Sequence, residues 1–125
     1  MSERELDPRM VMGARKITDE MRGSSKPRWE SLRSRLVAES VSPSDAAVGI
    51  LYPDDVKLEM GLIAARDGRV FEFALEWWYD EDGNELNSHD DAWLSEWKEL
   101  VPSEMSAMEK EIGGVARAVL RQDSP

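Results

Sequence analysis

The chain has no cysteine and only one histidine among its 125 residues. Without cysteine there can be no disulfide, thiol nucleophile or thiolate zinc site. The single histidine, His89, excludes a histidine-rich metal site and has no serine at the spacing of a known nucleophile motif. Glycine-rich loops that bind phosphate are also missing. The sequence therefore predicts no catalytic residues, no metal site and no cofactor.

Long apolar runs are absent as well. No stretch approaches the roughly 18 apolar residues that a membrane-spanning helix needs. The first five residues are mostly charged and lead into no signal-peptide core. These features predict a cytoplasmic protein with no membrane partner.

Basic side chains are scarce in one part of the chain. Residues 1–50 carry nine basic and eight acidic side chains, whereas residues 51–125 carry seven and eighteen, so the net charge of −10 arises in the second part. A pI near 4.6 argues against a nucleic-acid partner, because the phosphate backbone would be repelled. A basic protein is the better expectation.

Hydrophobic residues make up 41% of the sequence, which is enough for one folded domain over residues 1–125. Apolar spacing predicts an amphipathic helix over residues 4–22, with a true start near Asp7 because of Pro8. A second helix should begin at Pro27, and residues 47–52 should form a strand. The second helix carries an apolar stripe of Trp29, Leu32, Leu36 and Val37.

A β-hairpin is predicted around Asp67-Gly68, a dipeptide typical of two-residue turns. The flanking strands would be Val56–Arg66 and Arg69–Tyr79, in a register where paired residue numbers sum to about 135. In that register five apolar pairs share one face, which we expect to be the core: Ala64 with Phe71, Leu62 with Phe73, Met60 with Leu75, Leu58 with Trp77, and Val56 with Tyr79.

The rest of the chain predicts a short strand at residues 84–87 and two helices. Ser88 resembles a helix N-cap, and the helix it opens would run to Val101 and pack Trp93 and Trp97 on the sheet. Ser103 would cap the last helix, in which Gly113-Gly114 suggests close packing, a kink or a break. The predicted fold is α+β, with two N-terminal helices, a small antiparallel meander of three or four strands, and two C-terminal helices.

The other face of the predicted hairpin is acidic. Glu59 and Glu76 would lie directly opposite each other, with Glu72 and Trp78 on the same face. Opposed like charges destabilise a sheet unless something compensates them. Arginines 28, 33 and 35 of the second helix could pair with the acids, a basic partner could compensate them on binding, or two carboxylates could act as general acid and base.

The run from Asp80 to Asn84 partly matches a calcium-binding loop. Oxygen-bearing residues stand at the first, third and fifth positions, but Glu85 replaces the glycine of the sixth, and the preceding segment reads as a strand. A hairpin turn explains the same residues without a metal.

The leading hypothesis is a non-enzymatic, acidic protein-binding module, of the inhibitor or immunity type, for a basic partner. One alternative is a small-molecule-binding or enzymatic domain with a sheet–helix pocket lined by Glu59, Glu72, Glu76 and Trp78. Another is a homo-oligomeric structural protein. The residues predicted to contact the partner are Glu59, Glu72, Glu76, Trp78, Asp80, Asp82, Asp90 and Asp91.

Overall fold

The computed structural model describes residues 6–52, 58–77, 82 and 92–123. Within those ranges the chain forms three α-helices and a four-stranded antiparallel sheet, so the predicted α+β class is confirmed. In chain order the elements are α1 (Pro8–Gly23), α2 (Pro27–Ala38), β1 (Ala46–Tyr52), β2 (Leu58–Ala65), β3 (Val70–Glu76), β4 (Trp93–Glu99) and α3 (Ala107–Asp123).

The two N-terminal helices follow the sequence prediction. Helix α1 begins after Asp7, whose side chain accepts a hydrogen bond from the Arg9 backbone N–H at 2.9 Å. Helix α2 begins at Pro27 and buries Trp29, Leu32 and Leu36 completely. Val37, predicted in the same stripe, is 64% exposed because it lies about 100° around the helix from Leu36.

The sheet is a simple meander in which each strand pairs with its neighbours in sequence, in the order β1-β2-β3-β4. The β2–β3 register differs from the prediction by one residue: Ala64 pairs with Val70 and Ile63 with Phe71. The turn has three residues, closed by a bond from the Ala65 N–H to the Arg69 carbonyl at 2.9 Å. A two-residue turn would need positive φ at both Asp67 and Gly68, and only Gly68 has it, at 103°.

This shift changes which β2 residues share a face with the aromatic residues of β3. Phe71, Phe73 and Leu75 keep their place in the core, but their partners are Ile63, Gly61 and Glu59 instead of the even-numbered residues. A one-residue slip moves every side chain of a strand to the opposite face. The predicted apolar pairs are therefore wrong, although the apolar identity of the β3 face is right.

The predicted helix over residues 88–101 is wrong where the structure describes it. Trp93–Glu99 form the edge strand β4, which pairs with β3. Trp97 lies opposite Phe73 and stacks on Phe71, with ring centroids 4.8 Å apart. An irregularity in the pairing beside Ser95 puts Trp97 on the core face, while Trp93, opposite Glu76, lies on the other.

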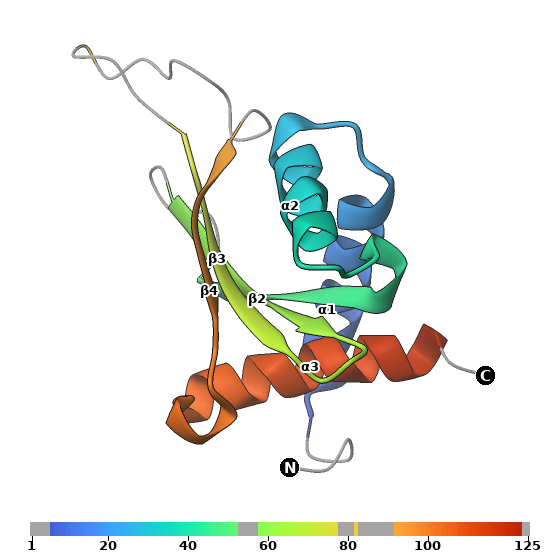
Figure 1. Cartoon of the computed structure of the whole chain (residues 1–125). Coiled ribbons are helices and arrows are strands. Elements are labelled where there is room, and N and C mark those ends of the chain that lie inside the picture. The colour runs from blue at the N-terminus through green and yellow to red at the C-terminus, as the bar shows by residue number, and fades with distance from the viewer. Residues whose placement is uncertain (1–5, 53–57, 78–81, 83–91, 124–125) are drawn as a thin grey trace.

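The helices cover the sheet from both sides (Figure 1). Helix α2 packs with the face that carries Phe71 and Phe73, whereas α3 crosses the opposite face over β1 and β2. The prediction of two C-terminal helices packed on one sheet face is therefore corrected. Among the described residues, α3 is the only C-terminal α-helix.

Helix α1 lies along the outer edge of the sheet. It contacts β1, α2 and α3, and the buried Thr18 Oγ1 accepts a hydrogen bond from the Val48 N–H at 2.9 Å. A covered and hydrogen-bonded edge cannot pair with another strand. None of the described helices combines the length and apolarity needed to cross a membrane.

The last helix starts three residues later than predicted. Ser106, not Ser103, forms a capping box: its Oγ accepts from the Glu109 N–H at 3.1 Å, and the Glu109 carboxylate accepts from the Ser106 N–H at 2.8 Å. Pro102–Glu104 form a short 3-10 turn, η4, before it. The helix continues to Asp123.

Candidate functional site

The sheet face that carries α3 is only partly covered by that helix. Helix α3 packs on β1 and β2, and its contacts bury Ala47, Ala64 and Leu62 near one end of the strands. Toward the other end Leu58 is 37% exposed. We define the open sheet face as the described residues on this side beyond α3: Leu58, Met60, Glu72, Ala74, Glu76, Trp93, Glu96 and Lys98.

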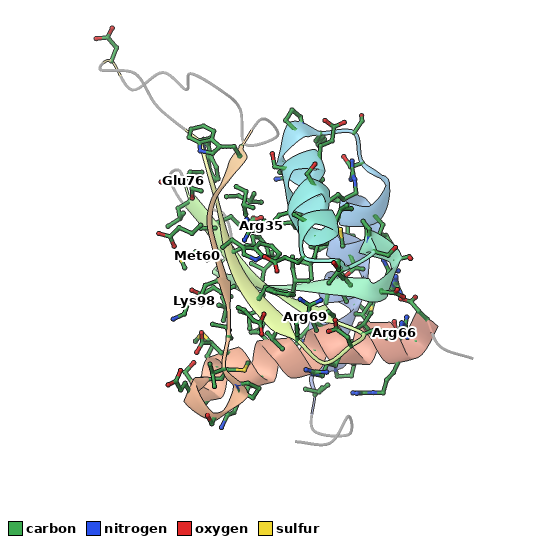
Figure 2. The ribbon with its side chains drawn as sticks, viewed as in Figure 1. Arg35, Met60, Arg66, Arg69, Glu76 and Lys98 are labelled. Atoms are coloured by element: carbon green, nitrogen blue, oxygen red, sulfur yellow. The ribbon has the colours of Figure 1, made fainter. Side chains whose placement is uncertain are left out.

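The strand pairing brings apolar side chains together at the centre of this face. Leu58 lies opposite Glu76, Met60 opposite Ala74, and Glu76 opposite Trp93. Met60 and Trp93 are half-buried, and Ala74 is covered by its longer neighbours. Figure 2 shows Met60, Glu76 and Lys98 on the side of the sheet away from α2. The result is an apolar patch from β2 and β4, with the buried Ala74 of β3 between them.

Acidic groups surround this patch. Of the charged residues that define the open sheet face, Glu72, Glu76 and Glu96 are acidic and Lys98 is basic. Lys98 pairs across the strands with Glu72. The open sheet face therefore carries an excess of negative charge next to exposed apolar surface, which is the combination expected of a surface that selects basic partners.

Glu72 forms a carboxyl pair with Glu109 of α3. Burial raises the pKa of Glu72, and a hydrogen bond to Glu109 together with the negative charge of Glu109 and Glu96 acts in the same direction. The backbone N–H of Ser106 lowers the pKa of Glu109. When the pKa values of two neighbouring carboxyl groups are displaced in opposite directions, the pair binds one proton more tightly than a single isolated carboxyl group would.

The structure separates the two acids that were predicted to face each other. Glu59 pairs with Leu75 on the α2 side of the sheet and is 7% exposed, whereas Glu76 lies on the open sheet face. The prediction that they are directly opposed is wrong, because it depended on the two-residue turn. Glu72 and Glu76 share a face, as predicted, since they are four residues apart on one strand.

The arginines of α2 were one predicted source of compensation for these acids. In the structure Arg33 donates to the Met21 carbonyl and Arg35 to the Glu39 carboxylate, at 2.6 and 2.8 Å. Arg28 lies 3.9 Å from Glu20 and stacks over the Trp29 ring. All three belong to the helix on the opposite side of the sheet from Glu72 and Glu76, so they do not neutralise the open sheet face.

Several predicted partner-binding residues lie outside the described ranges. These are Trp78, Asp80, Asp90 and Asp91, along with His89 and most of the run that partly matches a calcium loop. Asp82 is described and is exposed. In the described portion of the chain, no group of three or more histidine or acidic side chains is arranged to hold a metal ion.

Sequence reasoning missed Leu58, Met60 and Trp93 as surface residues. The first two were assigned to the core by the wrong register, and Trp93 was assigned to a helix. A three-residue turn with glycine in its last position fits Arg66-Asp67-Gly68 equally well and would have placed Leu58 and Met60 correctly.

Comparison with known proteins finds no family model, no curated protein and no solved structure that matches the chain. The open sheet face and its chemistry are therefore the basis for a proposed function.

Proposed function

We propose that this protein is a non-enzymatic binding module whose open sheet face docks a basic protein partner. The observation that carries the proposal is an apolar patch formed by Leu58 and Met60 of β2 and Trp93 of β4, next to a covering helix and bordered by Glu72, Glu76 and Glu96. An inhibitor or immunity protein that neutralises a cationic toxin or nuclease would need a surface of this kind.

The apolar and acidic parts of the surface have different roles in this proposal. Net charge of −10 and the acidic border attract a basic partner over long range and raise the rate of encounter. Trp93, Leu58 and Met60 then bury apolar area and slow dissociation, because partly exposed aromatic residues that become buried on binding are typical hot spots. Asp82 and the acidic residues around it in sequence add to the attraction.

The test is affinity capture from the native host, followed by binding kinetics with the purified partner. Glu76→Gln should slow association several-fold in low salt, and Trp93→Ala should weaken affinity about ten-fold, mainly through faster dissociation. Leu58→Glu should also weaken affinity. Because Leu58 is exposed, this substitution removes no buried side chain. Glu30→Gln is the matched control, since it makes the same charge change on exposed α2 surface.

The proposal would be refuted if the captured partner were acidic. It would also be refuted if Glu30→Gln and Glu76→Gln affected binding equally. The same holds for association that does not slow as salt is raised. Sedimentation at several protein concentrations tests the homo-oligomer alternative. If the wild type self-associates and Leu58→Glu does not, the open sheet face is a contact between copies of the chain.

A further inference from the structure

A groove of about 520 Å³ lies on another part of the α3 surface, and none of the residues that define the open sheet face lines it. Its walls come from α3, from η4 and the residues after it, and from the start of β3. The apolar part of its lining is Val70, Pro102, Met105 and Ala107. This volume lies within the range that small organic ligands occupy in proteins.

The glycine pair of α3 lines this groove. The sequence suggested that Gly113 and Gly114 mark close packing, a kink or a break, but α3 is one continuous helix. A Cβ at Gly113 would come no closer than 3.6 Å to Met105 Cε, and one at Gly114 no closer than 3.8 Å to Leu6 Cδ2, which are ordinary contacts. Close approach of a neighbour therefore does not require these glycines.

Two glycines of the sheet, Gly49 and Gly61, are by contrast required by the close approach of a neighbour. A Cβ at Gly49 would come within 2.7 Å of Ile112 Cγ2, and one at Gly61 within 2.7 Å of the Gly49 carbonyl. An interior helical glycine is less favourable than alanine. The effect of the pair is that the part of the groove wall at Gly113 and Gly114, between Lys110 and Arg117 on α3, carries no side chain.

Two cations lie on the same side of α3, one turn on either side of the glycines. Lys110 and Arg117 both line the groove, and Glu111 is the acid on its rim. The Arg117 guanidinium donates to the Gly68 carbonyl at 2.8 Å, which fixes it against the β2–β3 turn. Among the described residues, the Lys110 ammonium has no ion-pair partner.

The positive charge continues past Arg117. An adjoining cleft of about 160 Å³ shares Arg117 and is also lined by Arg66 and Arg121. Figure 2 shows Arg66 at the other end of the sheet from Glu76. Arg66 is paired with Asp45 at 3.1 Å, so the cations that line the groove itself are Lys110 and Arg117, in a protein with a net charge of −10.

We propose that this groove binds an amphipathic organic anion, with its anionic group between Lys110 and Arg117 and its apolar body against Met105, Val70 and the glycines. A medium-chain carboxylate is the simplest ligand of this class. The apolar lining favours a hydrocarbon body over a bare inorganic anion. Lys110 and Arg117 together with Glu111 leave one net positive charge in the lining, which matches a head group with a single negative charge. This site is independent of the docking surface proposed above, so either can fail without the other.

Decanoate is a suitable probe, with decanol and inorganic phosphate as comparison ligands, and binding to the full chain can be followed by amide chemical-shift changes. Decanoate should bind with a Kd below about 1 mM and shift amides of α3 and η4. Decanol and phosphate should each bind at least ten-fold more weakly. Equal binding of phosphate would indicate a simple anion site and overturn the proposal, as would the absence of decanoate binding.

Two variants locate the site. Gly113→Leu should fill the groove and weaken decanoate binding at least ten-fold, with Gly113→Ala as a smaller change that the local space accepts. Lys110→Gln should weaken binding several-fold, whereas Lys16→Gln, the same change on exposed α1 surface, should have no effect. Lys110 is exposed, so its variant tests the proposal even if Gly113→Leu does not fold. Unchanged affinity in Lys110→Gln would refute it.

Discussion

Burial, and then the neighbouring carboxylate of Glu109, raise the pKa of Glu72 above its ordinary value. Glu72 sits half-buried on β3, with Glu109 and Glu96 nearby and Lys98 as the opposing charge. Sequence reasoning identified Glu72 as part of an acidic face but paired the wrong acids. The partner that raises its pKa, Glu109, comes from a helix 37 positions later, and no local pattern links the two.

This raised pKa gives a prediction for stability. A carboxyl group whose pKa is higher in the folded state than its ordinary value of 4.5 adds stability that is complete below that value and is lost as pH rises through the folded pKa. Glu72→Gln keeps the neutral, donating form at all pH values. We expect it to stabilise the fold by about 0.5 kcal/mol at pH 7 and to have little effect near pH 4.

Thermal unfolding of Glu72→Gln at both pH values provides the measurement, with Glu104→Gln on the exposed η4 turn as the control. If Glu72→Gln is less stable than the wild type at pH 7, then the attraction of Glu72 to the charge of Lys98 outweighs the repulsion from Glu109.

At the scale of elements, the β2–β3 hairpin and β4 contrast in how far the sequence predicts them. The turn was placed at the right residues because Asp67-Gly68 is a strong local signal, yet its length was wrong by one residue. Strand β4 was predicted as a helix because Trp93 and Trp97, four apart, fit a helical stripe. What decides its conformation is pairing with β3 and the stack of Trp97 on Phe71, which are contacts distant in sequence.

Two glycine substitutions should have opposite effects on stability although their chemistry is identical. A Cβ at Gly68 or at Gly13 would meet no atom within 4 Å, but Gly68 has φ of 103° and Gly13 lies inside α1. Gly68→Ala should therefore destabilise the fold by about 1 kcal/mol, and Gly13→Ala should stabilise it by up to about 1 kcal/mol.

Urea unfolding of the two variants side by side measures both effects. If both substitutions changed the free energy of unfolding equally and in the same direction, Gly68 would not have the positive φ of the turn.

For the whole molecule, Asp123 connects the end of α3 to α1. Its carboxylate accepts hydrogen bonds from Arg15 at 2.7 Å and from Arg22 at 2.9 Å. Arg22 also donates to the carbonyls of Pro43, Ser44 and Ala46, so this cluster joins both ends of the described chain to the start of β1. An acid at a helix C-terminus opposes the helix dipole, and the two guanidinium groups offset this cost.

The hydrogen bond from Arg22, and then that from Arg15, lowers the pKa of Asp123 below its ordinary value of 3.8. A lowered folded pKa adds stability that is present above the unfolded value and is lost as pH falls through the folded one. Asp123→Asn should therefore cost about 1 kcal/mol at pH 7, and the difference from the wild type should shrink as the pH falls below 3.8 and in 1 M salt. Urea unfolding at several pH values tests this; a difference that does not change with pH would attribute the effect to packing instead.

The sequence alone determined the two N-terminal helices, the position of one turn, the apolar face of β3 and the concentration of acid in the second part of the chain. These follow from local periodicity, glycine conformation and composition, which need no knowledge of distant contacts. Only the tertiary structure decided that β4 is a strand, that Glu59 and Glu76 lie on opposite faces, and that α3 covers part of one sheet face and leaves the rest open. Those outcomes depend on strand register and helix placement, where a shift of one residue reverses every side chain.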